Sequence, residues 1–268
     1  MSRKVFVLLL TVLMLFASGC YMGISDLWLS RSVTGVWEGQ LELDGNRLIV
    51  QGFNGDIAVE VWDRPDIDVR INWAARKNLP DFQPVVEINS DYTRIVWDKS
   101  VEEINGLSYT ISVPAGIELE LVSSNGRITL SGQPLAALTA RSSNGSVLVT
   151  NAGVDELVIR TSNGLVRIEN WLGDIDCTTS NGAIHAHLGL VTQQDHKFTT
   201  SNGSINIILD RNSAFSFSAS TSNSSINSNL NGRWNTQPTG SNFSGTYNGG
   251  GAEIVARTSN SSISVRSR

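Results

Sequence analysis

The sequence predicts an all-β protein: a single-stranded parallel β-solenoid, similar to a β-helix, with a partly irregular N-terminal β region. Two observations predict this fold. A short polar phrase, RTSNG at 160–164 and RSSNG at 141–145, recurs along the chain, and apolar and polar residues alternate on both sides of each copy. Only 17% of the 268 residues are charged. This composition, without a long helical pattern, is typical of a turn-rich β protein.

The spacing of the phrase indicates stacked structural units. Measured between its asparagines, the intervals are 19, 19, 18, 21, 21 and 37 residues. A period near twenty is the signature of a repeat architecture, in which each unit buries its apolar side against its neighbours. The longest interval divides into 19 and 18 residues if Asn242 marks a degenerate turn. The reference asparagines are Asn125, Asn144, Asn163, Asn181, Asn202, Asn223 and Asn260.

The residues that flank the phrase predict two short strands per repeat. Apolar residues stand four positions before the asparagine and three and five positions after it, and Cys177 fills one of these inward positions. The inward-facing residues are an even number of positions before the asparagine but an odd number after it. A straight strand cannot make this change, so the chain must bend at the phrase. Asparagine and glycine both tolerate the left-handed backbone region, which we expect at this bend. A less regular corner is expected near Leu135, Val154, Leu172 and Ala214.

The repetition of asparagine has a structural explanation. In a solenoid, equivalent residues lie above one another, so stacked amides can pass hydrogen bonds from layer to layer. We therefore interpret the seven reference asparagines as a structural turn ladder. The serine before each asparagine, and the serine or threonine before that, are expected to form parallel hydroxyl ladders.

The N-terminus predicts a lipid anchor. Residues 1–19 read as a signal peptide, with Arg3 and Lys4 followed by an apolar run too short to cross a bilayer comfortably. The following ASGC resembles a bacterial lipobox, in which Cys20 is diacylated; an ordinary cleaved signal is the alternative. We expect residues 20–44 to be the lipidated N-terminus and a spacer. Residues 45–120 are expected to cap the solenoid, which spans 121–268.

The negative net charge expected for the mature chain argues against nucleic acid as a partner. Removal of residues 1–19 leaves 18 basic and 25 acidic residues. Such an acidic protein, without a basic stripe, is a poor candidate for nucleic acid. Attachment to a membrane is therefore expected through lipid rather than through electrostatic attraction.

No pair or cluster of residues predicts catalysis or a cofactor. His185 and His187 face the same way and form a weak metal candidate, but a metal site needs three or four ligands. Asp174 and Asp176 share a face, as paired carboxylates do in glycosidases and as calcium ligands do in polysaccharide lyases. Solvation of a polar surface explains both pairs more simply, so we expect no metal, no cofactor and no enzyme.

The order RLIVQGFNGDIAVEVW, then TISVPAGIELELVSSNG, then repeated SSNG and TSNG strands resembles the bacterial putative-adhesin family. This resemblance covers about 45–268. It implies a domain of unknown function on an envelope lipoprotein. We therefore expect a lipid-anchored, non-catalytic binding or structural module with a glycan or protein partner. The alternatives are an accessory or sensing component of an envelope-stress response and a β-helix polysaccharide lyase or hydrolase. Tyr21, in place of aspartate after Cys20, favours the outer membrane.

Overall fold

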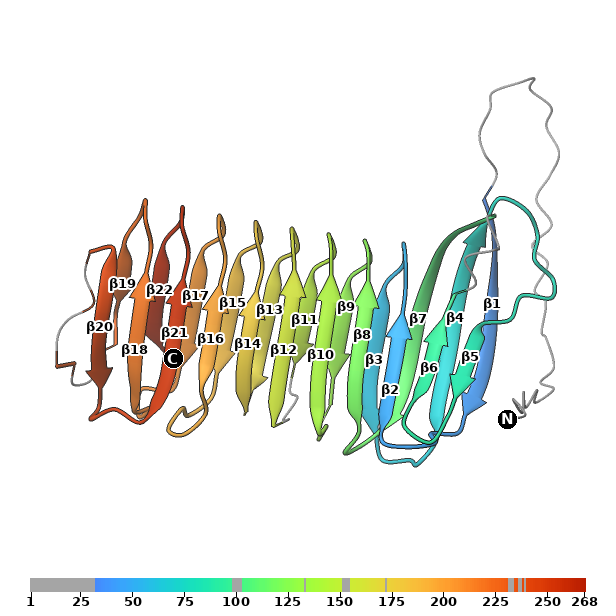
Figure 1. Cartoon of the computed structure of the whole chain (residues 1–268), viewed down its shortest axis with the longest axis horizontal. Coiled ribbons are helices and arrows are strands. Elements are labelled where there is room, and N and C mark those ends of the chain that lie inside the picture. The colour runs from blue at the N-terminus through green and yellow to red at the C-terminus, as the bar shows by residue number, and fades with distance from the viewer. Residues whose placement is uncertain are drawn as a thin grey trace, which may run out of the picture.

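The protein is an elongated stack of strands. The structure is a computed structural model that describes residues 32–97, 103–132, 134–150, 155–171, 173–230, 234–235, 238 and 240–268. The described strands form two sheets of 11 strands each, which lie one behind the other along the whole molecule (Figure 1). Strands of neighbouring repeats pair in parallel. The predicted class, an all-β parallel solenoid, is confirmed.

The two sheets contain the following strands, given in spatial order. Sheet A consists of β1 (Val33–Leu41), β4 (Ile67–Ala75), β7 (Ile104–Pro114), β3 (Ile57–Trp62), β9 (Ile128–Ser131), β11 (Val147–Thr150), β13 (Val166–Trp171), β15 (Ile184–Leu188), β17 (Ile205–Leu209), β22 (Ile263–Ser267) and β19 (Ile226–Ser228). Sheet B consists of β20 (Asn242–Tyr247), β18 (Phe215–Ser220), β21 (Ala252–Arg257), β16 (His196–Thr199), β14 (Asp174–Thr178), β12 (Glu156–Thr161), β10 (Ala137–Ser142), β8 (Glu118–Ser123), β2 (Arg47–Gln51), β6 (Thr93–Val96) and β5 (Val85–Ile88).

Each repeat is one rung with a strand in each sheet. The chain runs along sheet B, bends at S-N-G, and returns along sheet A, so the bends form one edge of the stack (Figure 1). The inward-facing side chains fill the space between the sheets and are buried, as the alternation predicted. The buried residues before the bend are Leu121, Ala140, Ile159, Cys177, Phe198, Ala219 and Ala256. Those after it are Ile128, Val147, Val166, Ile184, Ile205, Ile226 and Ile263.

At the opposite edge, the expected third corner is only partly described. Leu135 is buried and Ala214 is half-buried, whereas Val154 and Leu172 lie outside the described residues. The loops at this edge differ in length from rung to rung. This difference accounts for the variation in the spacing of the asparagines.

The rungs do not stack in sequence order at the C-terminal end. The last rung in the sequence, β21 and β22, lies between β16–β17 and β18–β19. The expected turn at Asn242 is wrong, because Asn242 begins β20, which pairs antiparallel with β18. The 37-residue interval therefore contains a cap strand and a return into the stack, not an extra rung.

The N-terminal end is interleaved in a similar way. The first rung, β2 and β3, lies between β8–β9 on one side and β6–β7 on the other. The irregular region predicted here contains antiparallel pairs, because β4 pairs antiparallel with β1 and β7, and β5 does so with β6. The segment expected as a spacer over 20–44 includes strand β1.

Aromatic side chains close the C-terminal end of the core. Trp234 packs edge-on against Phe243 at 5.5 Å between ring centroids, and Phe215 lies 5.2 Å from Tyr247. Phe217 belongs to the same cluster. The cluster lies at the end of the stack, at the rung of β18 and β19 and next to the antiparallel strand β20. Large rings replace the aliphatic residues of the middle rungs here because this layer has no further rung above it to bury it.

Candidate functional site

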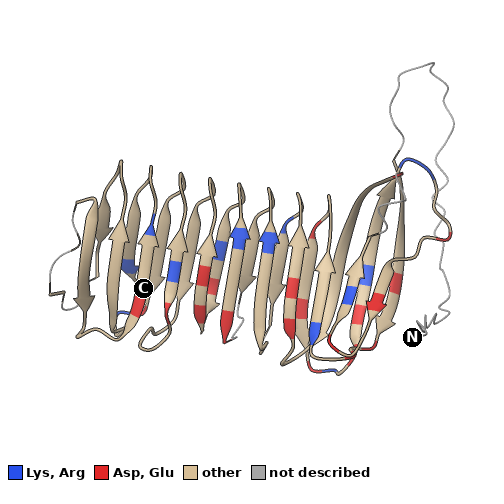
Figure 2. Cartoon of the chain, viewed as in Figure 1, with Lys and Arg blue, Asp and Glu red and all other residues tan. Residues whose placement is uncertain are grey.

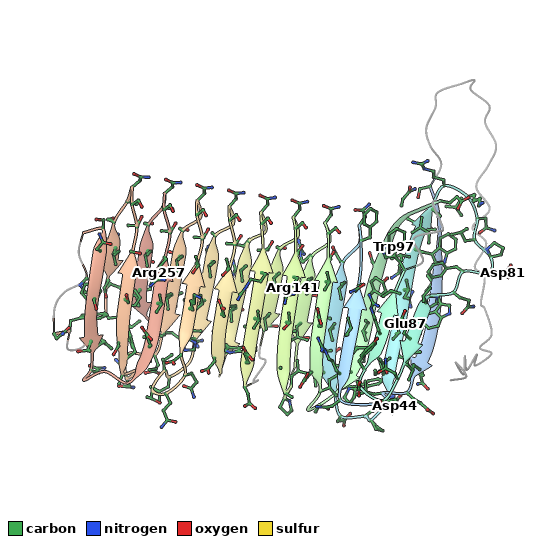
Figure 3. The ribbon with its side chains drawn as sticks, viewed as in Figure 1. Asp44, Asp81, Glu87, Trp97, Arg141 and Arg257 are labelled. Atoms are coloured by element: carbon green, nitrogen blue, oxygen red, sulfur yellow. The ribbon has the colours of Figure 1, made fainter. Side chains whose placement is uncertain are left out.

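The asparagines of the bends form one hydrogen-bonded column. The Nδ2 group of Asn125 donates to Oδ1 of Asn54 at 2.6 Å, and the same contact repeats up the stack at 2.6–2.7 Å. Sequence reasoning had left Asn54 out of the ladder. The observed order is Asn54, Asn125, Asn144, Asn163, Asn181, Asn202, Asn260 and Asn223. Side chains project from the bends in a regular row along this edge (Figure 3).

The glycine after each asparagine is required by the rung beneath it. A Cβ atom on Gly164 would lie 1.9 Å from the carbonyl oxygen of Gly145, and Gly126, Gly145, Gly182 and Gly203 show the same approach at 1.8–1.9 Å. The expectation of a left-handed backbone at this bend is wrong. The described residues with positive φ are elsewhere, at Asn170, Asn248 and seven other glycines. Close stacking, rather than an unusual dihedral angle, therefore selects glycine.

A buried hydroxyl column supports the same bends from inside. The hydroxyl of Ser142 accepts the backbone N–H of Gly145 at 2.9 Å, and Thr200 accepts that of Gly203 at 3.1 Å. Where serine replaces glycine at positions 224 and 261, the threonine hydroxyls donate to a carbonyl of the neighbouring rung. These contacts are Thr258 to Gly203 and Thr221 to Ser261, both at 2.9 Å. Both columns hold the bend edge in a fixed, regular geometry.

The outer face of sheet B carries both acidic and basic residues, and Arg47 and Lys197 lie level with acidic ones. Arg141 and Arg160 are register partners next to the bends. The acidic residues of this face that flank these rungs lie further down the strands (Figure 2); they include Glu118, Glu120, Glu156, Asp174, Asp176 and Glu253. An open groove of about 270 Å³ lies beside the two arginines, and Ser124, Ser143 and Ser162 are among the residues that line it. We call this feature the arginine–serine groove.

The two arginines of the groove differ in their partners. Arg160 donates to the carboxylate of Asp176 and, at 2.7 Å, to the backbone carbonyl of the same residue. Arg141 makes no ion pair within the described part of the chain and is exposed. The groove therefore presents one guanidinium that is available to an anion, with hydroxyl donors on either side.

The surroundings of the histidine pair His185 and His187 do not favour a metal ion. His185 and His187 lie on β15 beside Arg167 and Glu169, which form an ion pair at 3.3 Å. Burial lowers the pKa of His185, and the charges of Arg167 and Arg266 lower it further. Such a positive surrounding opposes a cation. The described residues contain no group of three or more metal-ligating side chains.

Asp174 and Asp176 have structural contacts rather than a free, paired geometry. Asp174 accepts the backbone N–H of Asp195 at 2.9 Å, and so fixes the loop before the next strand. Asp176 is held by Arg160. Cys177 is buried and burial raises its pKa, so the thiol stays protonated. The hydroxyl of Ser213 is also buried and accepts the N–H of Val191 at 3.0 Å.

Among the described N-terminal strands, Trp62, Trp73 and Trp97 do not form a side-by-side platform. Trp73 is buried, and Trp62 donates to the carbonyl of Asp66 at 2.9 Å with the Arg64 guanidinium over its ring. Trp97 stacks on Phe53 with 5.2 Å between ring centroids and lines an apolar cavity at this end of the core. Sequence reasoning missed this cavity, because its walls come from segments far apart in the chain.

The predicted anchor is not part of the described structure. Cys20, with residues 1–19 and Tyr21, lies outside the described residues. Within the described part of the chain, no helix has the length and apolar character needed to span a membrane.

The fold and the polar edge define the class of this protein as a two-sheet β-solenoid with an asparagine spine. The chain belongs to the Toastrack DUF4097 family, whose model matches residues 98–266. The matched range begins after β2 and β3, although these strands form a rung inside the stack.

Solved structures that are similar to this chain have low sequence identity to it. A putative adhesin from Parabacteroides distasonis ATCC 8503 is 14% identical with a TM-score of 0.50, over 87% of this chain and 97% of that chain. A putative adhesin from Bacteroides fragilis NCTC 9343 is 13% identical with a TM-score of 0.45, over 86% and 97% of the two chains. No curated protein matches the chain.

Proposed function

We propose that this chain is a lipid-anchored protein of the bacterial cell envelope that acts as a non-catalytic binding module. The lipobox-like ASGC with Cys20 supports the anchor, and Tyr21 supports the outer membrane. The names of the similar structures, putative adhesins, support a place at the envelope. The structural contacts of Asp174 and Asp176 favour binding over hydrolysis.

The observation that carries the proposal is the arginine–serine groove on a rigid face. Arg141 and the hydroxyls of Ser124 and Ser143 are suited to a carboxylate or phosphate, since a guanidinium and hydroxyl groups all donate hydrogen bonds to anions. Hydrogen bonds along both columns fix the bends from which these side chains project, and such a preorganised backbone lowers the cost of binding. The partner we propose is an acidic glycan of the envelope.

Binding to acidic glycans tests the groove. An array of acidic and neutral glycans is probed with the full chain, with Arg141→Gln, and with Arg211→Gln as the matched control. Arg211 is an exposed arginine in the loop between β17 and β18. Loss of a charged hydrogen bond of about 1.5–3 kcal/mol predicts a tenfold or larger drop in affinity for Arg141→Gln alone. Equal binding by both variants, or no binding by the unaltered chain, would reject the groove as the site.

Metabolic labelling tests the anchor separately. Cells given radiolabelled palmitate should label the unaltered chain, and the label should disappear in Cys20→Ala. Undiminished labelling of Cys20→Ala would refute lipidation at this cysteine without affecting the glycan proposal.

A further inference from the structure

The cavity at the N-terminal end of the core is unlike the rest of the interior. It has a volume of about 380 Å³, within the range of about 300–1,000 Å³ that is typical of small-molecule sites. Protein interiors are otherwise close-packed. The segment 76–84 crosses from β4 in sheet A to β5 in sheet B and forms one wall. The cavity therefore lies where the two sheets end and a loop, rather than another rung, covers the core.

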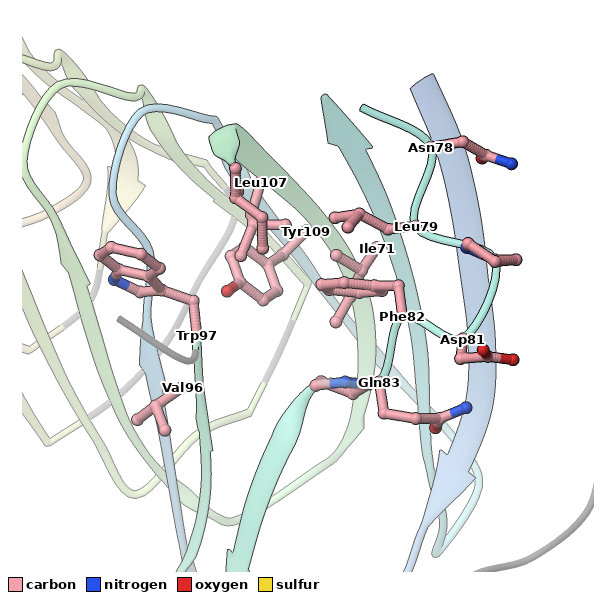
Figure 4. Close-up of a pocket in the computed structure, with 13 residues that line it drawn as sticks. Ile71, Asn78, Leu79, Asp81, Phe82, Gln83, Val96, Trp97, Leu107 and Tyr109 are labelled. Atoms are coloured by element: carbon pink, nitrogen blue, oxygen red, sulfur yellow. The ribbon is translucent and has the colours of Figure 1, made fainter. Parts of the chain in front are cut away.

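The walls of the cavity are apolar. Trp97 and Phe82 lie on opposite sides, and Leu107 and Tyr109 lie between them (Figure 4). Leu79 and Ile71 complete this surface. The Tyr109 hydroxyl donates to the carbonyl of Gln51 at 3.4 Å, and burial raises its pKa, so the phenol is neutral. The walls thus offer hydrocarbon and aromatic contact without a charge.

The rim of the cavity is polar and lacks a cation. Asn78 and Asp81 point away from the cavity (Figure 4), and Gln83 accepts the indole N–H of Trp37 at 3.0 Å. Asp81 is the only ionisable acid or base among the described lining residues apart from Tyr109, and the neighbouring Lys77 is paired with Glu103. A ligand with a carboxylate or phosphate end would meet no counter-charge from these lining residues, whereas the Gln83 amide still has N–H donors that can bind a hydroxyl.

We propose that this cavity binds a neutral amphiphile, one whose hydrocarbon chain lies between Phe82 and Trp97 and whose uncharged polar end lies at the rim. A monoacylglycerol has this chemistry. The apolar walls provide affinity through burial of the chain. No described residue that lines the cavity carries a positive charge, so the carboxylate of a fatty acid of the same chain length would have no counter-charge there. This proposal is independent of the glycan site, because the arginine–serine groove lies on the outer face of sheet B.

Photo-crosslinking in detergent tests the site on the full chain. The probe is a monoacylglycerol that carries a diazirine in its chain and an alkyne tag, and mass spectrometry identifies the labelled peptides. We expect saturable labelling within 78–84 and 96–97. Excess unlabelled monoacylglycerol should compete at least tenfold better than the fatty acid of equal length at pH 8.

Two variants and a control decide the location. Leu79→Trp fills the cavity and Phe82→Ala removes one wall, so each should reduce labelling at least fivefold. Leu165→Trp, which places the same residue on an exposed bend far from this end, should leave it unchanged. Thermal unfolding identifies a variant that fails to fold. If one of the two cavity variants fails, labelling of the other cavity variant tests the location. Labelling that is unsaturable, maps elsewhere, is insensitive to the folded variants or is competed equally by the fatty acid would overturn the proposal.

Discussion

Three residues at each bend have different structural roles. The asparagine amide bonds to the next amide, the glycine allows the backbones to approach, and the serine or threonine two positions before the asparagine binds the glycine N–H from inside. The repeated phrase is therefore maintained by stacking. Sequence reasoning predicted the amide ladder, but it explained glycine by its dihedral freedom, since a contact between rungs is invisible in one repeat.

Replacement of a stacked glycine tests this explanation. Gly164→Ala places a Cβ atom against the carbonyl oxygen of Gly145, so the rungs must separate. We expect the free energy of unfolding to fall by more than about 3 kcal/mol. Gly116→Ala is the control, because its φ is 78° and nothing lies near the added Cβ; its cost should be about 1–2 kcal/mol. Urea unfolding curves measure both, and equal losses would contradict a stacking role.

His196 makes stability depend on pH. The His196 side chain is buried, and its register partners on the two neighbouring strands are Ile175 and Ile254. Neither ring nitrogen has a hydrogen-bond partner among the described residues. Burial lowers its pKa to about 4, although the carboxylates of Asp174 and Asp195 act in the opposite direction. The folded protein thus holds a neutral imidazole over most of the pH range.

The sign of the effect follows from the lowered pKa. Between pH 6.5 and 4 the unfolded chain binds a proton that the folded chain does not, so the free energy of unfolding falls as the pH falls. The total is about 3 kcal/mol, with no contribution above pH 7. His196→Leu should remove this loss, as measured by urea unfolding from pH 7 to 4. If the unaltered chain and His196→Leu lose stability in parallel, the histidine is not responsible.

At the scale of elements, strand positions were predictable but their order was not. The alternation around each asparagine located the inward residues on both sides of the bend, because burial of one face imposes a period of two. Nothing in that pattern records which rung lies next to which, since the rungs are nearly equivalent. The insertion of β22 between β17 and β19 depends on the cap strand β20 and the return loop, which have no counterpart in other repeats.

Truncation at the C-terminus tests the insertion. A chain that ends at Asn260 lacks β22, so it should lose the pairing of both β17 and β19. We expect hydrogen exchange at residues 226–228 and 205–209 to accelerate at least tenfold, while residues 147–150 stay protected as an internal control. Unchanged protection at 226–228 would mean that β22 is a dispensable edge strand.

At the scale of the whole molecule, the class of fold followed from the repeat period, but the pattern did not predict the detailed structure of either end. The N-terminal end has antiparallel strands, the apolar cavity and strand β1 where a spacer was expected. These features arise from contacts between segments that are distant in sequence, such as Leu79 of the 76–84 loop with Tyr109 of β7 around one cavity. A periodic pattern predicts the repeated part of a solenoid, but it does not predict the structures that cap its two ends.

The order of the asparagine column is the central claim, and disulfide formation tests it most directly. Asn260 lies next to Asn202 in the column, and Asn223 lies one rung further. Adjacent strands are about 4.8 Å apart, within disulfide reach, whereas two rungs exceed the limit of about 7 Å. In a Cys20→Ser chain, mild oxidation should therefore join cysteines placed at 202 and 260, but not cysteines at 202 and 223. A disulfide between 202 and 223, without one between 202 and 260, would contradict the account.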